Sequence, residues 1–291
     1  MKLITQTEAL SQRFGDLNAV RMICESGFDG LDYSMFNMRS NPNYVLNTAD
    51  YERFARQLSD IVKSYGKTFE QSHAPFPTAI HKNEKYNKEM FEKVKRSIEI
   101  AGILNAKIIV IHPVYYKHNK FERNMELYHS LEPFAEEYGV KIAVENMWGR
   151  GFKNKIKPNV CSVPDEFNKY VDALGKKNFT ACLDLGHCGL VGEDAADMIR
   201  KLGGERLGCL HIHDNNFVED SHTLPYTRDM DWDSVISALK ETDYKGHFTY
   251  EADNFLKKFP NDLLKPALVF MREVGRSMID KIENKNEIKY L

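Results

Sequence analysis

Short apolar runs alternate along this chain with longer stretches in which apolar residues recur at helical spacing. The clearest run is AKIIVIHPV at positions 106–114, which contains no polar residue from Ile108 to Ile111. A continuous apolar run of this length is typical of a parallel strand that is covered on both faces. The same reasoning predicts further strands in KLITQ, GLDYSMF, KTFEQSHAPF, VKIAVEN, FTACLDLGH, LGCLHIHD and HFTYEAD.

The stretches between these runs predict amphipathic helices. In segment 50–65, for example, Phe54, Leu58, Ile61 and Val62 share one helical face. Eight strand–helix units without a linker-like segment predict one domain over residues 1–291, a single (β/α)8 TIM barrel whose active site lies at the C-terminal ends of the strands. An open doubly wound sheet is the alternative, but it usually carries a glycine-rich phosphate turn, and the sequence contains no GxGxxG or Walker-type loop. The other helices are expected at 17–27, 84–104, 121–138, 165–174, 195–202, 231–241 and 262–283.

Histidine and acidic residues stand at or just after the ends of the predicted strands, all on the expected catalytic side of the barrel. Imidazole and carboxylate ligands suit Zn²⁺ or Mn²⁺ best, with Fe²⁺, Co²⁺ and Mg²⁺ as further candidates. Carboxylates gathered in one pocket repel one another, so a bound cation is the natural reason for such a cluster. The candidate ligands are His73, His112, Glu145, Asp184, His187, His211, Asp220, His222 and Glu251.

Two residues near this set receive other roles. His213 follows His211 by two positions and is expected to point to the opposite side, as a packing or hydrogen-bonding residue. Trp148 precedes the basic stretch GRGFKNKIK, and the two together are expected to cover a bound substrate. A solvated loop is the alternative for that stretch.

The ordered motifs SHAP, IHP, VENM, LDLGH, LHIHD, DSH and YEAD resemble those of the xylose isomerase-like TIM-barrel superfamily, over nearly the whole chain. That superfamily contains sugar (phosphate) isomerases and epimerases as well as endonuclease IV-type apurinic/apyrimidinic nucleases. The resemblance implies one metal on Glu145, Asp184, His211 and Glu251, with both glutamates as the acid/base pair and His187 in contact with the substrate. Additional ligands of the trinuclear nuclease site match His73, His112, Asp220 and His222, with His187 as a further candidate ligand.

Both ligand sets are present, so the ligands alone leave both branches open. The first hypothesis is a divalent-metal-dependent sugar or sugar phosphate isomerase/epimerase, in which the glutamates transfer protons through a metal-stabilised enediolate. HTLPYTRDMDW at 222–232 favours it, because it resembles the H-x-x-P…D-W stretch of the sugar branch, from which it departs at Tyr226 and Thr227. The second hypothesis is an endonuclease IV-like AP endonuclease with a multinuclear metal site, and the third is a non-catalytic, sugar-responsive binding protein.

Composition and charge indicate which class of partner and which cellular compartment to expect. The formal net charge of −2 gives no sign of a basic surface for nucleic acid, which favours a small-molecule carbohydrate as the partner. No run approaches the ~18 apolar residues of a membrane span, and the N-terminus lacks a signal-peptide core. A cytoplasmic protein is expected, and a homo-oligomer stays open. Reduced, buried thiols are expected for the five cysteines, which form no CxxC pair: Cys24, Cys161, Cys182, Cys188 and Cys209.

Overall fold

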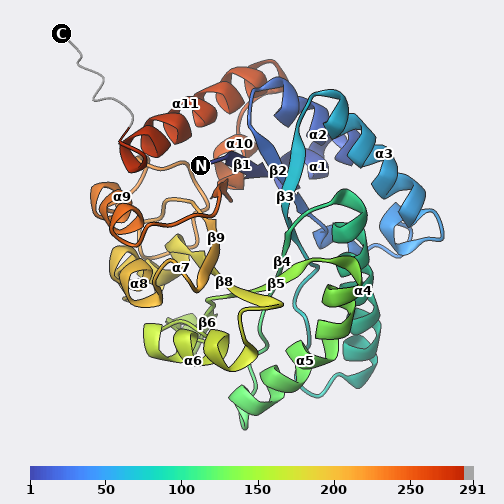
Figure 1. Ribbon diagram of the computed structural model, residues 1–291, viewed down its shortest axis with the longest axis vertical. Coiled ribbons are helices and arrows are strands. Elements are labelled where there is room, and N and C mark those ends of the chain that lie inside the picture. Colours follow the sequence, from blue (N-terminus) through green and yellow to red (C-terminus); the bar gives the residue numbers. More distant parts are fainter. Residues whose placement is uncertain (285–291) are drawn as a thin grey trace.

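Eight parallel strands form the centre of the computed structural model, which describes residues 1–284. The strands are β1 (Leu3–Gln6), β2 (Gly30–Ser34), β3 (Thr68–His73), β4 (Ile108–Ile111), β5 (Lys141–Glu145), β8 (Phe179–Asp184), β9 (Leu207–His211) and β10 (Phe248–Tyr250). From β1 to β9, each strand pairs with the next of these along the chain, and β10 pairs with β1. Ile212, just beyond β9, pairs with Tyr250 and closes the ring. The predicted (β/α)8 barrel is therefore confirmed, with the strands at the centre of Figure 1.

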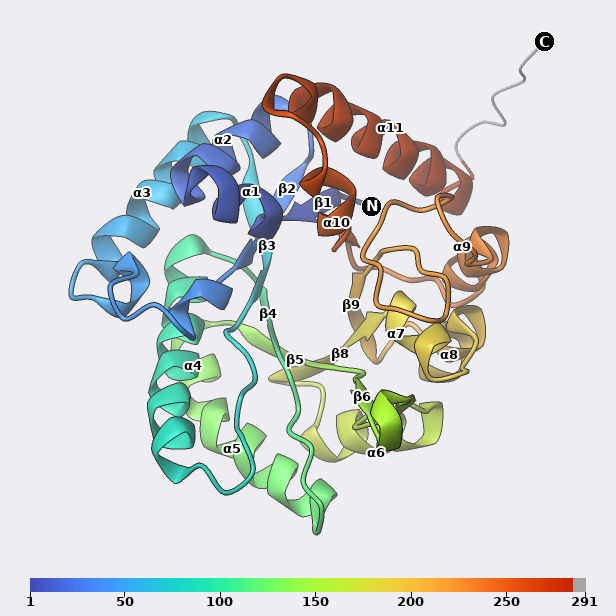
Figure 2. The same cartoon turned by 180° about the vertical axis from the view of Figure 1, so that it is seen from behind.

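Helices surround the ring of strands, as both views show (Figures 1 and 2). Helix α4 illustrates how the sequence sets their limits: the Asn83 side chain accepts a hydrogen bond from the Tyr86 amide at its start, and Asn105 ends it in the left-handed conformation at φ 61°. None of the helices within residues 1–284 combines the length and apolar character that crossing a membrane requires. The helices are α1 (Glu8–Phe14), α2 (Asp16–Glu25), α3 (Tyr51–Ser64), α4 (Glu84–Leu104), α5 (Lys120–Tyr138), α6 (Pro164–Leu174), α7 (Leu185–Leu190), α8 (Ala195–Leu202), α9 (Trp232–Glu241), α10 (Asp253–Lys257) and α11 (Leu264–Ile282).

Some short elements were missed by the sequence reading. The run FTACLDLGH ends as a strand at Asp184, because the Asp184 side chain accepts a hydrogen bond from the His187 amide and starts α7. Helices α1 and α10 are too short to show a helical period in the sequence. Trp148 and the basic stretch that follows it form an antiparallel hairpin of β6 (Trp148–Arg150) and β7 (Ile156–Pro158), which the sequence analysis did not predict.

The barrel interior is divided between apolar and polar side chains. Val110, Ala143, Cys182 and Cys209 form a small apolar cluster of their own, apart from the main core between strands and helices. On the neighbouring strands, the interior holds the buried polar side chains of Gln6, Asp32, Gln71 and Thr249. All five cysteines are free and buried, as expected. The polar part of the interior lies directly beneath the predicted ligands, where Gln6 donates to Glu251 and Gln71 contacts His211.

Candidate metal centre

The barrel brings all nine predicted ligands to one end. The residues stand at or beyond the C-terminal ends of β3, β4, β5, β8, β9 and β10, and parallel strands place those ends side by side. Their donor atoms form overlapping groups in which every atom lies within 4.8 Å of the others. Three of these donor groups make up the candidate site. They are the central group (Glu145, Asp184, His211, Glu251), the inner group (His73, His112, Glu145) and the outer group (His187, Asp220, His222).

The central group is buried completely or nearly so. His211 Nδ1 lies 3.1 Å from Glu145 Oε1 and 3.0 Å from Glu251 Oε2, so one imidazole nitrogen faces both glutamates. Asp184, which is 0% exposed, completes the group from β8. These are the four residues for which the sequence predicts a single metal ion, and the fold assembles them from four different strand ends.

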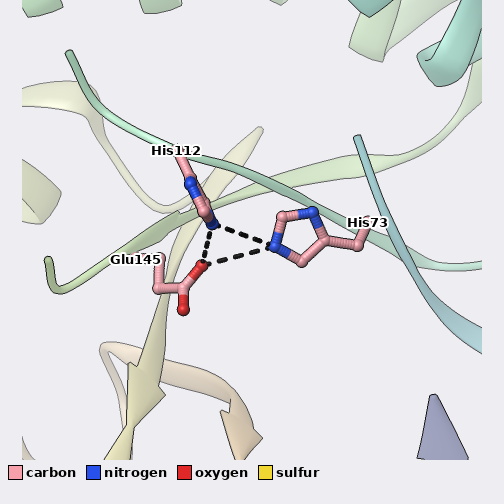
Figure 3. Close-up of side chains that lie close together, drawn as sticks. All are labelled: His73, His112 and Glu145. Carbon is pink, nitrogen blue, oxygen red and sulfur yellow. Dashed lines mark hydrogen bonds and ion pairs between the residues drawn. The ribbon is translucent and has the colours of Figure 1, made fainter. Parts of the chain in front are cut away.

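The inner group uses the other oxygen of Glu145 (Figure 3). Glu145 Oε2 lies 2.8 Å from His112 Nε2 and 3.4 Å from His73 Nε2, and the two imidazole nitrogens are 3.1 Å apart. Phe76 stacks on His112 with ring centroids 4.6 Å apart and contacts His73 edge-on. Glu145 therefore faces two donor groups at once, one with each carboxylate oxygen.

The outer group gathers around Asp220. Asp220 Oδ2 lies 3.0 Å from His222 Nε2 and 3.5 Å from His187 Nε2. The Trp148 indole donates a hydrogen bond of 3.2 Å to the same oxygen, which fixes the indole beside the site. The other oxygen, Asp220 Oδ1, is buried and accepts no hydrogen bond from any residue in 1–284.

Backbone carbonyls orient three of the imidazoles. His73 Nδ1 donates to Ala74 O at 2.8 Å, His187 Nδ1 to Asn146 O at 2.8 Å, and His222 Nδ1 to Glu251 O at 2.9 Å. When such an imidazole is neutral, its proton stays on Nδ1, and Nε2 can offer its lone pair to a cation among the donor groups. Metal-binding histidines are held in this way in proteins, because the second nitrogen fixes the tautomer and the ring orientation. The donor set and its supports thus fit a divalent cation.

The expected direction of the His213 side chain is wrong, whereas its expected role as a packing or hydrogen-bonding residue is confirmed. Residues two apart in an extended segment share a face, and His213 accordingly lies on the same side as His211. Its Nε2 lies 3.0 Å from Asp184 Oδ1, and its ring stacks on His222 with centroids 4.1 Å apart. His213 thus contacts both the central and the outer group.

Gly186 makes room for the His213 ring. A Cβ at this position would lie 2.0 Å from His213 Cε1. We expect Gly186→Ala to destabilise the protein by about 1–3 kcal/mol through overpacking, measured as a lower Tm in thermal unfolding. Gly151→Ala is the matched control, because its nearest neighbour is the flexible Lys157 side chain at 3.3 Å. Equal Tm values for Gly186→Ala and Gly151→Ala would contradict the close packing of the His213 ring against Gly186.

Asn146 is a site residue that the sequence reading did not assign. Its side chain accepts a hydrogen bond from the Asp184 amide at 2.7 Å and donates one to the Asp184 carbonyl at 3.0 Å. Its backbone carbonyl holds His187, as described above. The signal in the sequence is its place directly after Glu145, in VENM, but only the pairing of β5 with β8 shows what it contacts.

The buried charges shift one another's pKa values. Burial raises the pKa of Glu145, but the imidazoles of His112 and His211 outweigh it and hold this pKa well below the usual range. Burial likewise raises the pKa of Glu251, and His211 reverses that effect. Burial lowers the pKa of His222, but the hydrogen bond to Asp220 and the charge of Glu251 raise it to about 10. Both glutamates are therefore ionised at neutral pH, and His222 is protonated in the metal-free protein.

Metal binding is expected to release protons. The pKa of His211 also lies well above its ordinary value, because Glu251 and Glu145 outweigh the effect of burial. A ligand imidazole must lose its extra proton before it binds a cation. The affinity for Zn²⁺ should therefore rise between about pH 6 and pH 9, with proton release measured by titration calorimetry in buffers of different ionisation enthalpy. An affinity that is constant over this range would contradict the prediction.

A cavity of about 430 Å³ adjoins the donor groups. Its lining includes His112, Glu145 and Glu251 together with the aromatic side chains of Phe76 and Trp148. No lysine or arginine among the residues in 1–284 lines it. A ligand in this cavity would meet a metal-binding surface and aromatic rings, without a cation from the protein.

Comparison with known proteins agrees with the fold and the motifs. Residues 20–274 match the family model described as "Xylose isomerase-like TIM barrel". The chain is 28% identical over 219 residues to the uncharacterized protein MJ1311 of Methanocaldococcus jannaschii, covering 69% of this chain and 70% of that protein. Among solved structures, a D-tagatose 3-epimerase-like protein aligns with a TM-score of 0.73 at 22% identity, covering 98% of this chain and 99% of that one. The IOLI protein with a bound zinc atom aligns with a TM-score of 0.71 at 19% identity, covering 99% and 100%.

The family model spans most of the chain, and the matched residues include all nine predicted ligands. The two structural likenesses, at their low identities, concern the fold alone. The chain belongs to the xylose isomerase-like TIM-barrel family.

Proposed function

We propose that this protein is a divalent-metal-dependent isomerase or epimerase of carbohydrates. The observation that carries the proposal is the pair of buried glutamates, Glu145 and Glu251, which face the same nitrogen of His211 and also line the cavity. Two carboxylates on one substrate cavity, both ionised at neutral pH, are suited to removing a proton and returning one. The names of the epimerase-like and zinc-binding structural relatives support this choice.

Glu145, Asp184, His211 and Glu251 would hold the metal ion, with Zn²⁺ or Mn²⁺ as the ions that best suit their oxygen and nitrogen atoms. When bound, the ion supplies Lewis-acid polarisation of a carbonyl group and of the hydroxyl next to it. The protein supplies the rigidity of the site, because each ligand stands on a different strand end and is fixed by its neighbours.

One of the two glutamates removes the proton from the carbon next to the substrate carbonyl. In isomerisation the same carboxyl group returns this proton to the adjacent carbon. In epimerisation the other glutamate first takes up a proton from solvent and then donates it to the opposite face of the carbon. The low pKa values of both carboxylates keep them ready to accept a proton. Gln6 donates a hydrogen bond of 2.8 Å to Glu251 Oε1, and the other oxygen, Glu251 Oε2, faces His211 Nδ1. His187 and Trp148 line the cavity beside them and are suited to contact the hydroxyl groups and one ring face of a sugar.

Solvent deuterium tests this proposal. Metal-loaded protein is incubated in deuterated water with a panel of aldoses, ketoses and their phosphates, and each sugar is followed by NMR. We expect deuterium to enter at the carbon next to the carbonyl of at least one sugar, together with formation of its epimer or isomer. The absence of exchange across the panel, combined with incision of abasic DNA by the same preparation, would overturn the proposal.

A second candidate function is phosphodiester hydrolysis at abasic sites in DNA by a multinuclear metal centre. One observation favours it: Glu145 is shared between the central and inner groups, and a third donor group lies beside them. A carboxylate between two donor groups is the arrangement that a two-metal site uses. The cavity lining without lysine or arginine and the net charge of −2 argue against a polyanionic substrate. Incision of an abasic duplex by the metal-loaded protein tests it directly.

A further inference from the structure

The long loop between β9 and α9, residues 212–231, carries two members of the outer group. They are Asp220 and His222, and both line the cavity. Figure 2 shows the loop in orange between the two elements. No helix or strand lies within residues 212–231, so regular secondary structure does not fix where these two side chains stand.

Three residues of this loop have a backbone conformation that side chains disfavour. Phe217, His222 and Tyr226 have φ values of 60°, 40° and 69°, in the left-handed region. Such a conformation is costly for any residue other than glycine, and it persists only where the surrounding structure imposes it. One of the three is His222 itself. Contacts outside regular secondary structure must therefore hold the loop in its shape.

The side chain of Asp214 makes such contacts. It is 0% exposed, and both of its oxygens accept hydrogen bonds from the later part of the same loop. Asp214 Oδ2 accepts from the amides of Thr227 at 3.1 Å and Arg228 at 3.0 Å, and from the Trp232 indole at 3.1 Å. Asp214 Oδ1 accepts from the Met230 amide at 3.1 Å. Four N–H groups thus take the place of water around one buried carboxylate.

The backbone of Asp214 holds the residue directly after His222. The Asp214 amide donates to the Thr223 carbonyl at 2.8 Å, and the Thr223 amide donates to the Asp214 carbonyl at 3.4 Å. One residue therefore fixes the loop at residue 223 through its backbone and at residues 227–232 through its side chain. We propose that Asp214 is a positioning residue, which holds this loop so that Asp220 and His222 face the cavity. Asp214 itself belongs to no donor group and does not line the cavity, so its effect passes through the loop.

The two tryptophans of the chain report on this arrangement separately. Trp232 donates its indole N–H to Asp214, and Trp148, which stands on β6, donates its indole N–H to Asp220 at 3.2 Å. Trp148 does not belong to the loop, so its indole signal follows the position of Asp220. NMR of protein with ¹⁵N-labelled tryptophan should show two indole signals, which Trp148→Phe assigns.

The first test compares these signals in chelator-treated wild-type protein and in Asp214→Asn, after thermal unfolding has shown that each is folded. An asparagine keeps one acceptor oxygen and turns an N–H donor toward the remaining N–H groups, so part of the hydrogen bonding is lost. We expect the Trp148 signal to move toward its position in Asp220→Ala, which lacks the acceptor. Asp16→Asn is the matched control, because it also replaces a buried carboxylate, one that accepts from Tyr44, and should leave the signal in place.

A Trp148 signal that stays at the wild-type position in folded Asp214→Asn would overturn the proposal, as would an equal shift in Asp16→Asn. A purely structural role of Asp214 would lower the Tm without moving this signal. If Asp214→Asn does not fold, Trp232→Phe decides the question, because it removes one of the four donors and leaves Trp148 as the single indole. Its signal should then shift in the same direction, and an unchanged signal would overturn the proposal.

The second test concerns catalysis and rests on the proposed function. We expect Asp214→Asn to lower solvent deuterium exchange into the substrate by about 10²-fold, the effect of displacing active-site side chains by about 1 Å. Wild-type exchange in this variant would contradict the positioning role. Absence of exchange in the wild-type protein would defeat the proposed function alone, because the Trp148 signal tests the role of Asp214 without any substrate.

Discussion

We expect the wild-type protein to carry a metal ion after purification without added metal, and we expect Asp184→Ala and Asp184→Asn to lose it. Asp184 belongs to the central group and is fully buried, so its loss removes one of the four donors of that group. We expect the affinity to fall by more than about 100-fold, because even the loss of a ligand's hydrogen-bond partner costs about 10–100-fold. The asparagine variant separates ligation from folding, since asparagine still caps α7 as Asp184 does for the His187 amide. Mass spectrometry of metal content is the measurement.

His112→Ala is the companion variant for this experiment. His112 contacts only the inner group, through Glu145 and His73. A wild-type protein with one ion per chain that His112→Ala retains would support a single-metal carbohydrate site. Two or three ions in the wild type, with partial loss in His112→Ala, would show that the inner group binds metal, and abasic DNA would then be tested before any sugar.

Glu145→Gln is expected to lower the rate of solvent deuterium exchange into the substrate by about 10²–10⁴-fold, the usual contribution of a general acid or base. The amide keeps the shape of the side chain but cannot accept the substrate proton. His112 and His211 would also lose the carboxylate that each now contacts. Exchange is measured by NMR at saturating metal, so that weaker metal binding by the variant does not lower the rate.

Glu251→Gln should lower exchange to a similar degree, because the proposal needs both carboxylates. Glu8→Gln, a buried carboxylate outside the donor groups, should exchange at the wild-type rate. Full activity in Glu145→Gln would remove this residue from the proton-transfer role. Full activity in all three variants would mean that neither glutamate carries the proton.

The strands of the barrel could be predicted because each strand is one continuous segment of the chain with a recognisable pattern of apolar residues. The run Ile108–Ile111 is apolar throughout, and β4 occupies these residues. Helix α4 occupies the predicted residues 84–104, and the structure shows Asn83 and Asn105 at its two ends. Helix α7 was missed because its start depends on the hydrogen bond from the His187 amide to the Asp184 side chain. The sequence is equally compatible with a strand that continues for three more residues.

By itself, the sequence determined the alternation of strands and helices, and with it the end of the barrel at which the nine candidate ligands lie. These properties depend on the periodicity of neighbouring residues, which the chain carries locally. The resemblance already implied the four residues of the central group. The tertiary structure alone decided that Glu145 faces two groups and that His213 joins Asp184. It also placed Asp32, from β2, behind His211 of β9. Contacts between side chains so far apart in the chain depend on strand register and ring orientation, which only the closed barrel fixes.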